Sequence, residues 1–475
     1  APCATSGLPA REALFFKPEE RYYNRSAVTI ARWSANEKYI SEEGGKSGKE
    51  LKRIEAVIKS VAPQVELPGN LHKLEKKFKD LNWLSVIHAD GNGLGQIFLK
   101  FDEYIGLKEE EGDPRAYIDK YRRFSLSLDV CTVNAAGQAL ENLRKRFRAV
   151  EEEKANRQGD GHIPGEIPVV PLVLGGDDLT VLCDGQYALK FVYDFLTQFE
   201  KETGSITGHD YLKEDAEGQP LLIDGQTVFE LLRGIIPEIA ERAFDVPRLG
   251  ICAGVALVKP HFPFHQAYTL AKKLLDSAKH VKKNVRSQSK DEPYPCSALD
   301  YHILYDSTAS RLEGIRDRLK SDGQTTWLYA RPYVVSNISD EYPANDWLKW
   351  RKWSELEKRV AVMLAKDKDD EHKRKLPNSQ LHSLREALFL GKDEADARTR
   401  LVNHRYKDQG FDKLLCDTKA ETLFFEEKRD GHGGHATHFL DALDIVEFRK
   451  GEEEKDGKLR DKPGSAAAAQ PTTSE

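Results

Sequence analysis

The sequence has no apolar run close to the ~20 residues that a membrane-spanning helix requires. Charged residues make up 32% of its 475 positions and apolar residues 39%, so we expect a water-soluble protein without a membrane segment. A basic-then-apolar leader of the secretory type is also absent, which favours the cytoplasm. The six cysteines include no C-x-x-C pair, which argues against both a zinc ribbon and a disulfide framework and fits a reducing compartment.

A strong excess of charge of either sign is absent as well. The formal net charge is −6 and the sequence pI is about 6.2, so no global property marks a protein that coats nucleic acid. Two short basic stretches, 144–148 (RKRFR) and 366–375 (KDKDDEHKRK), keep one alternative open, in which the chain is a subunit that holds RNA in a ribonucleoprotein. The same stretches are also typical of solvated helix and loop surface.

Composition along the chain predicts four regions. Polar stretches with apolar residues at three- and four-residue spacing indicate helices before residue 82 and again after residue 305. The last stretch has too little apolar content to fold. We therefore predict a helical N-terminal cap (1–81), a central domain (82–305), a C-terminal helical domain (306–450) and a disordered tail (451–475).

The central region alternates strand and helix patterns. Helical periodicity predicts helices at about 114–155, 186–200 and 265–283, and short apolar runs predict strands at about 82–90, 167–174, 179–183 and 249–258. The resulting order, β-α-β-β-α-β, predicts an α+β fold of the ferredoxin-like type, with helical additions at both ends.

Two adjacent carboxylates stand at the turn of the predicted hairpin. In 169–185 (VVPLVLGGDDLTVLCDG), Asp177 and Asp178 follow two glycines that suit a tight turn. In this topology the first strand ends beside that turn, which brings Asp90 to the same edge of the sheet. Three carboxylates in one small volume repel one another unless cations neutralise them. The alternative is an acidic hairpin turn without a ligand.

Hard oxygen ligands suit Mg²⁺ or Mn²⁺. We therefore predict that Asp90, Asp177 and Asp178 are metal ligands and catalytic residues. The loop 90–98 (DGNGLGQIF) adds backbone N–H groups that can face a triphosphate. Its G-x-G-x-G spacing, with the acid before the glycines, differs from the dinucleotide-binding fingerprint.

The predicted helix after the fourth strand adds a cation to this edge. It starts near His265 at the far end of the sheet, and a length of ~27 Å returns its end to the edge with the carboxylates. Lys279 is therefore placed to meet phosphates, whereas Lys282 and Lys283 are equally well explained as solvated lysines. The predicted nucleotide-binding residues are Gly91, Asn92, Gly93, Gly95, Gly175, Gly176 and Lys279.

Four motifs in this order resemble a known family. The stretches HADGNGLGQIF, LVLGGDDLTVLCDG, AGVALVKPHFPFHQAYTLAKKLLDSAK and SALDYHIL are similar to the GGDD palm of the large polymerase-like subunit of type III CRISPR effector complexes. The resemblance covers about 82–305 and is more distant to GGDEF diguanylate cyclases. Family subunits usually carry two palms, a nuclease domain and a four-cysteine zinc module, whereas this sequence shows one palm and no paired cysteines.

The resemblance implies a nucleotidyltransferase that joins ATP or another NTP into cyclic oligonucleotides, which are second messengers in antiviral defence. It implies two divalent ions on Asp90, Asp177 and Asp178, and a phosphate contact for Lys279. Because one palm binds one activated nucleotide, we expect a homodimer or a partner palm. RNA and CRISPR effector subunits are further expected partners.

Two other features carry weaker expectations. His432, His435 and His438 have spacings that could place two of them on one metal, but the glycines between them favour a flexible loop before a helix near Thr437. Aromatic residues in 325–335 (TTWLYARPYVV) could stack on a base, although aromatics in an apolar stretch are more typical of a core.

Overall fold

The computed structural model describes residues 12–16, 21–25, 53–78, 81–106, 114–158, 164–214, 218–223, 225–286, 293–305, 311–338, 346–367, 373–429 and 431–448. The chain forms two compact units, Ala1–Ala56 and Val57–Glu475. In the first unit, β1 (Glu12–Phe16) and β2 (Arg21–Arg25) pair as an antiparallel hairpin. The sequence analysis missed this hairpin, although aromatic residues in both strands favour extended structure. The predicted tail, 451–475, lies outside the described residues.

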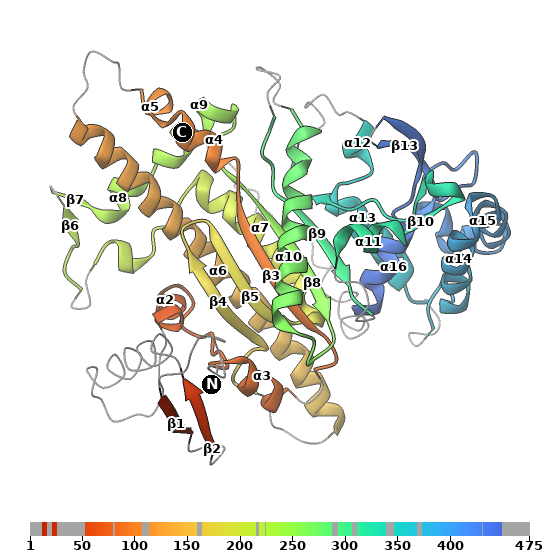
Figure 1. The fold of residues 1–475 in the computed structure, drawn as a ribbon, viewed down its shortest axis with the longest axis horizontal. Helices are drawn as coiled ribbons and strands as arrows, with labels where there is room; N and C mark the ends of the chain where they lie inside the picture. Colours follow the sequence, from red (N-terminus) through yellow and green to blue (C-terminus); the bar gives the residue numbers. More distant parts are fainter. Residues whose placement is uncertain are drawn as a thin grey trace, which may run out of the picture. The chain divides into compact units, whose positions relative to one another are not determined.

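The second unit is built on a six-stranded sheet with the strand order β12-β9-β8-β3-β5-β4 (Figure 1). β3 pairs antiparallel with both β5 and β8, and β4 pairs antiparallel with β5, which is the ferredoxin-like arrangement and confirms the predicted α+β fold. β9 adds in parallel to β8, and β12 adds antiparallel to β9. The strands are β3 (Leu84–Asn92), β4 (Val169–Gly175), β5 (Asp178–Asp184), β8 (Gly250–Val258), β9 (Ala298–Ile303) and β12 (Tyr333–Val334).

β4 forms one edge of this sheet. Its register with β5 shifts between Pro171 and Val173, and proline within sheets is found on edge strands and at bulges of this kind. Leu172 and Val173 are exposed there.

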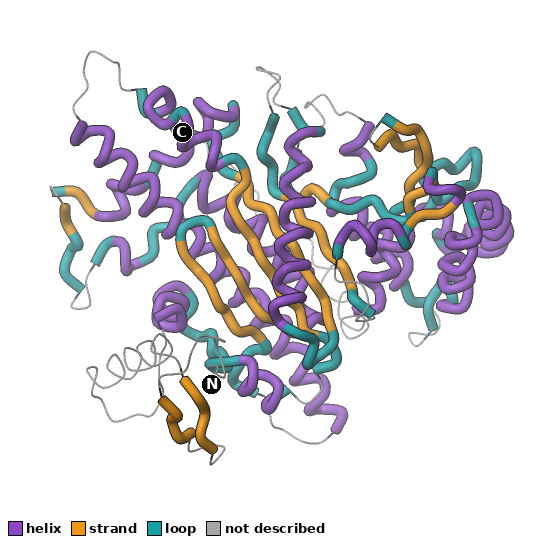
Figure 2. Tube along the Cα trace, in the orientation of Figure 1, coloured by secondary structure: helices purple, strands orange, loops and turns teal. Residues whose placement is uncertain are grey.

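Three long helices cover the sheet (Figure 2). α10 (Phe264–Lys279) lies across one face, and α6 (Pro114–Gln158) and α7 (Gly185–Gly204) pack together behind the other. α6 is one continuous helix, where the sequence analysis left one or two open. On the α10 face, Leu270 and Leu274 belong to one buried cluster with side chains from β3, β5 and β8, so apolar burial fixes where α10 ends.

Shorter elements flank the six-stranded sheet of the second unit. Two helices follow β3, and the segment between α7 and β8 holds a small hairpin and two more helices. Their bounds are α4 (Leu94–Leu99), α5 (Phe101–Tyr104), η3 (Asp210–Leu212), β6 (Leu222–Ile223), β7 (Gln226–Thr227), α8 (Val228–Leu232) and α9 (Ile235–Phe244), with α2 (Arg53–Val61) and α3 (Leu71–Lys77) before β3 and η4 (His280–Lys283) after α10.

The C-terminal region is helical, as predicted, and also contains a four-stranded sheet of order β10-β11-β14-β13. The prediction of a flexible loop at 432–436 is wrong, because this segment is β14 and pairs with β13 and β11. Its glycines permit close approach of the neighbouring backbone. The elements are α11 (Leu312–Asp317), β10 (Lys320–Ser321), η5 (Asp322–Gln324), β11 (Thr326–Trp327), α12 (Asp346–Lys349), α13 (Trp353–Leu364), α14 (Asn378–Leu390), α15 (Lys392–Tyr406), η6 (Lys407–Gln409), η7 (Phe411–Leu414), β13 (Phe425–Arg429), β14 (His432–Ala436) and α16 (Phe439–Phe448).

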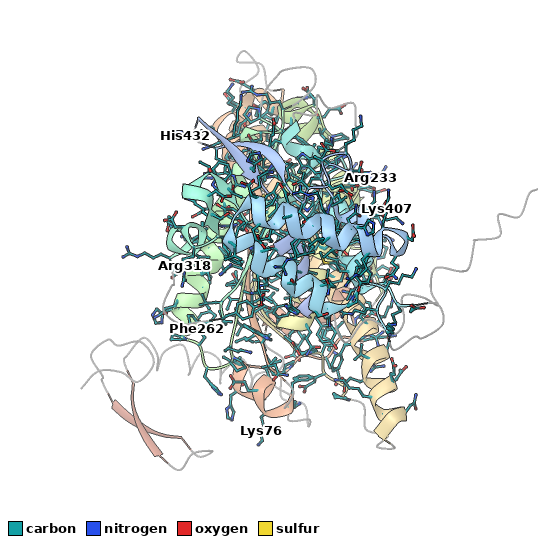
Figure 3. The ribbon with its side chains drawn as sticks, turned by 90° about the vertical axis from the view of Figure 1, so that its right-hand side faces the viewer. Lys76, Arg233, Phe262, Arg318, Lys407 and His432 are labelled. Carbon is teal, nitrogen blue, oxygen red and sulfur yellow. The ribbon has the colours of Figure 1, made fainter. Side chains whose placement is uncertain are left out.

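Figure 3 looks onto α14 and α15 and labels His432 beside the blue strands. Among the helices that the structure describes, none combines the length and the apolar character needed to cross a bilayer. The five cysteines within the described ranges are free thiols.

Candidate functional site

Strand pairing brings the three predicted carboxylates together. Ala89 on β3 pairs with Leu179 on β5, so Asp90 and Asp178 are next to these partners at the same end of the ladder. Asp177 occupies the turn between β4 and β5. The carboxyl groups of Asp177 and Asp178 both interact with that of Asp90, whose charge raises their pKa values. The structure thus brings the three carboxylates to one edge of the sheet, and their role as metal ligands stays a prediction.

Lys279 reaches the same cluster from the last residue of α10. Its Nζ donates to Asp90 Oδ2 and forms an ion pair with it. Both side chains are partly exposed, at 26% for Lys279 and 30% for Asp90, so a solute can approach the pair. The predicted return of α10 to this edge is confirmed, whereas Lys282 and Lys283 lie in the following η4 turn.

The charges in this cluster are not fully balanced. Burial raises the pKa of Asp90, but the hydrogen bond and the charge of Lys279 outweigh it and hold the pKa below its ordinary value. Burial and the charge of Asp90 raise the pKa of Asp177. The same two causes, joined by Asp177, raise the pKa of Asp178 to about 6. One ammonium thus compensates one carboxylate, and two acidic groups remain under repulsion.

α6 anchors the turn that carries the two aspartates. The Gly176 N–H donates to Asp129 Oδ1 at 2.7 Å, and Thr132 Oγ1 donates to the Gly176 carbonyl at 2.6 Å. Gly176 has a φ of +60°, a conformation that favours glycine. The sequence analysis missed Asp129 and Thr132. No local motif marks them, because their role depends on which turn of α6 lies under the hairpin.

The glycine loop lies directly against the carboxylates. A hydrogen bond from the Gly91 backbone to Asp177 offsets a small part of the rise in the pKa of that carboxyl. Asn92, also predicted to bind nucleotide, has a fully buried side chain that donates to the Cys296 carbonyl at 2.9 Å. Asn92 is buried as a whole residue and pairs with Gly250 on β8, so it does not contact a ligand in this conformation.

The donor set of the cluster fits a divalent cation in chemistry. Its oxygen ligands are hard, and the raised pKa values of Asp177 and Asp178 reflect negative charge that a cation would neutralise. Across the described ranges, however, no group of three or more His, Cys, Asp or Glu side chains is arranged as a metal site. Lys279 occupies the neighbourhood of Asp90 in this conformation, so metal binding requires side-chain adjustment or added ligands from a substrate.

Most described residues of the basic stretches and the histidine segment contact other side chains of the same chain. In the first basic stretch, Arg144 pairs with Glu141 and Arg146 with Asp194. The second stretch is only partly described. His438 is buried, with its Nε2 3.4 Å from Cys416 Sγ, while His432 is exposed on β14. Of these features, none builds a second acidic cluster or a metal site in the parts of the chain that the structure describes.

No protein-family model and no curated protein matches the chain. Solved structures do match. A chain from the Csm1-Csm4 cassette in complex with cA4 is 14% identical, with a TM-score of 0.36, and the match covers 81% of this chain and 40% of that one. Csm1 in T. onnurineus is 13% identical, with a TM-score of 0.35 and the same coverage. The chain thus spans about 40% of the length of these proteins, and the likeness concerns the fold.

The close approach at Gly91 predicts a specific cost for a side chain. A Cβ at this position would lie 2.5 Å from Leu94 Cδ1 and 2.7 Å from Asp177 Oδ2. We expect Gly91→Ala to lower the free energy of unfolding by about 1–2 kcal/mol, because the carboxylate must move. Gly95→Ala is the control, since no atom lies within 4 Å of its Cβ position in α4, and we expect it to be stabilising. Urea unfolding of both variants tests this, and equal effects would contradict it.

The raised pKa of Asp178 predicts a pH-dependent stability. The folded state favours the protonated carboxyl, so its stabilising effect is complete below the ordinary pKa of 3.8 and is lost as the pH rises through about 6. We expect Asp178→Asn to be more stable than the parent at pH 7.5 by about 1 kcal/mol, discounted for partial exposure, and to lose this advantage at pH 4.5. Thermal unfolding in chelator measures it. Asp408→Asn, at an exposed position, is the control, and a pH-independent difference would exclude the mechanism.

The anchor on α6 predicts a graded response at Asp129. Asp129→Ala leaves the Gly176 N–H without its acceptor and should cost about 1–2 kcal/mol of stability. Asp129→Asn keeps an acceptor oxygen for the Gly176 N–H and should retain most of the stability of the parent. If both variants lose the same stability in denaturant titrations, the carboxylate charge rather than the hydrogen bond holds the turn.

Proposed function

We propose that this chain is a nucleotidyltransferase that joins nucleoside triphosphates, with ATP as the first candidate, into a cyclic oligonucleotide. The observation that supports it is the meeting of Asp90, Asp177, Asp178 and Lys279 at one edge of a palm-like sheet. Paired carboxylates beside a lysine suit the handling of a triphosphate, because catalysis of phosphoryl transfer is mainly positioning and charge stabilisation.

Each residue has a distinct task in this proposal. Asp90, Asp177 and Asp178 would hold divalent ions, which when bound supply charge neutralisation and lower the pKa of the attacking ribose hydroxyl. Lys279 exchanges its contact with Asp90 for one with the triphosphate. The backbone at 91–95 approaches the phosphates, and Asp129 and Thr132 hold the turn in place.

The reaction balances as a substitution at the α-phosphorus. The ribose hydroxyl oxygen of an acceptor nucleotide forms a P–O bond, the bond from the α-phosphorus to the oxygen that bridges to the β-phosphate breaks, and pyrophosphate leaves. The hydroxyl proton passes to a carboxylate or to water. A second copy of the chain, facing the first, would present the acceptor.

The alternative of a non-catalytic RNA-binding subunit has less support. It depends on the basic stretches, and the described guanidinium groups of the first stretch are partly engaged with acidic side chains of the same chain.

The decisive test is incubation with ATP or GTP and Mg²⁺ or Mn²⁺, followed by mass spectrometry of the products. We expect cyclic oligonucleotide and pyrophosphate from the parent chain, and a loss of at least about 100-fold for Asp177→Asn/Asp178→Asn. Asp393→Asn/Asp408→Asn removes two exposed carboxylates from the C-terminal region and should leave turnover unchanged.

Thermal unfolding provides a second readout. Mn²⁺ should raise the Tm of the parent at pH 7.5 and have little effect on Asp177→Asn/Asp178→Asn. Equal turnover in the two double variants would reject the site. A monomer by light scattering that still forms the cyclic product would reject the paired arrangement alone.

A further inference from the structure

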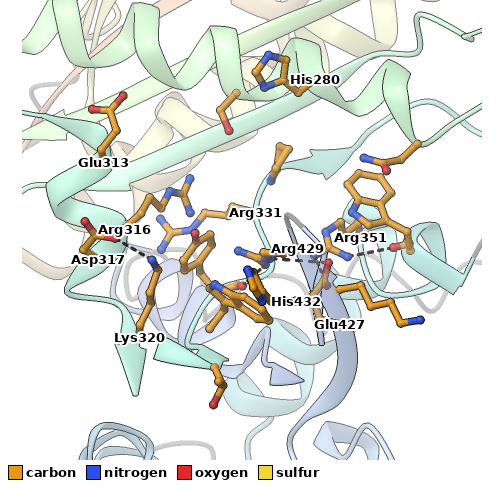
Figure 4. Close-up of a pocket in the computed structure, with 18 of the residues that line it drawn as sticks. His280, Glu313, Arg316, Asp317, Lys320, Arg331, Arg351, Glu427, Arg429 and His432 are labelled. Atoms are coloured by element: carbon orange, nitrogen blue, oxygen red, sulfur yellow. Dashed lines mark hydrogen bonds and ion pairs between the residues drawn. The ribbon is translucent and has the colours of Figure 1, made fainter. Parts of the chain in front are cut away.

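A cavity lies between the end of α10 and the C-terminal sheet (Figure 4). It measures about 1060 Å³, at the upper end of the range for small-molecule sites. Residues from η4, α11, β11, β13 and β14 line it. His280 reaches it from the side of α10, and Arg429 and Glu427 reach it from β13 (Figure 4).

The cavity is separate from the carboxylate cluster. Ser277 and His280 line it, whereas Lys279 turns to Asp90. Successive residues of a helix are rotated by about 100°, so Lys279 points about 200° away from Ser277 around the axis. The two sites therefore occupy different sides of the same helix end.

Cationic groups dominate the lining, which contains six Arg or Lys residues and three carboxylates. Some of this charge is compensated from behind, since Arg316 pairs with buried Asp300. Arg351 and Arg429, however, share the single carboxylate of Glu427. Burial lowers the pKa of Arg429, and the neighbouring charges of Arg351 and Arg316 lower it further. Arg331 is compensated by Asp441 and Asp444, and Lys320 by Asp317. Within the described wall, the local excess of positive charge therefore lies at Arg351 and Arg429.

Hydrogen-bonding capacity in this wall is also unused. Arg316 Nη1 and Arg351 Nε are buried and have no hydrogen-bond acceptor among the residues that the structure describes. A buried donor without an acceptor is unfavourable. An anion in the cavity would offer acceptors to a wall that lacks them. Lys320 and Lys428 add ammonium groups to the lining, and that of Lys320 pairs with Asp317.

Planar groups alternate along the same wall. The guanidinium of Arg429 lies 4.9 Å from the ring centre of Trp327 and 4.5 Å from that of Tyr329. The guanidinium of Arg316 lies 4.2 Å from the ring centre of Tyr329. Half-buried Trp347 provides a further ring, with Arg351 4.5 Å from its centre. Trp327 and Tyr329 are buried, so of these three rings the half-buried Trp347 is the one on which a nucleobase can stack.

We propose that this cavity binds a nucleotide or short oligonucleotide, with phosphates on its arginine and lysine side chains and a base against the ring of Trp347. This ligand site goes beyond the proposed function, since it does not use Asp90, Asp177 or Asp178 and stands whether or not they are catalytic. Every ligand of this class carries both a phosphate group and a planar base. A free nucleotide and the oligonucleotide product are its two possible sources.

Isothermal titration of the full chain in EDTA tests the proposal, with ATP, 5′-phosphorylated tetra-adenylate, tripolyphosphate and adenosine as probes. We expect ATP or the tetra-adenylate to bind, and the tighter of the two identifies the source. Lys320→Glu/Lys428→Glu should weaken binding at least about tenfold. Lys358→Glu is the matched control, because Lys358 pairs with Glu355 at 2.7 Å as Lys320 pairs with Asp317 at 2.8 Å, each three residues apart.

Two further variants separate the contribution of base stacking from that of phosphate binding, and this cavity from the carboxylate cluster. Trp347→Ala should weaken ATP without weakening tripolyphosphate, and Asp177→Asn/Asp178→Asn should bind the probes as the parent does. Circular dichroism confirms that each variant is folded. Equal affinity in the parent and Lys320→Glu/Lys428→Glu would overturn the proposal, as would tripolyphosphate binding as tight as ATP and insensitive to Trp347. A variant that loses turnover but keeps binding, or keeps turnover but loses binding, shows that the cavity and the carboxylate cluster are separate sites.

Discussion

Mutual repulsion among three acidic side chains is the constraint around which the palm is arranged. The fold brings the carboxyl groups of Asp90, Asp177 and Asp178 close together. This arrangement raises the pKa of Asp177 and Asp178, because like charges repel one another. A single ammonium from α10 offsets part of it. The backbone around them is correspondingly well supported, with α6 bound to the turn through both the N–H and the carbonyl of Gly176. Shifted pKa values of this kind cluster at functional sites.

The sequence predicted the palm well because its signals are periodic and local. Alternation of apolar runs and helical stripes gave the order of the elements, and the order alone determines that the end of β3 lies beside the β4–β5 turn. The position of Lys279 followed from the length of one helix. Each of these inferences depends on backbone geometry, which a few residues specify.

The remaining features depend on tertiary contacts that no local pattern encodes. Asp129 and Thr132 are unremarkable residues in the middle of a 45-residue helix, and only the packing of that helix under the hairpin gives them a role. The histidine segment looked like a loop because Gly433 and Gly434 favour turns, yet pairing with two neighbouring strands makes it β14. The arginine-lined cavity combines residues from 277 to 433, a separation beyond any motif.

The irregular edge of the palm has a consequence for how two copies of this chain can meet. A regular outer strand offers a row of unpaired amide groups onto which another strand can be added. β4 does not offer such a row, since Pro171 lacks the donor and the adjoining bulge breaks the register. Continuous sheet growth through this edge is therefore disfavoured, so self-association by accidental strand addition is suppressed. Contact between two copies through this edge must then be made by side chains, and single substitutions can alter its geometry.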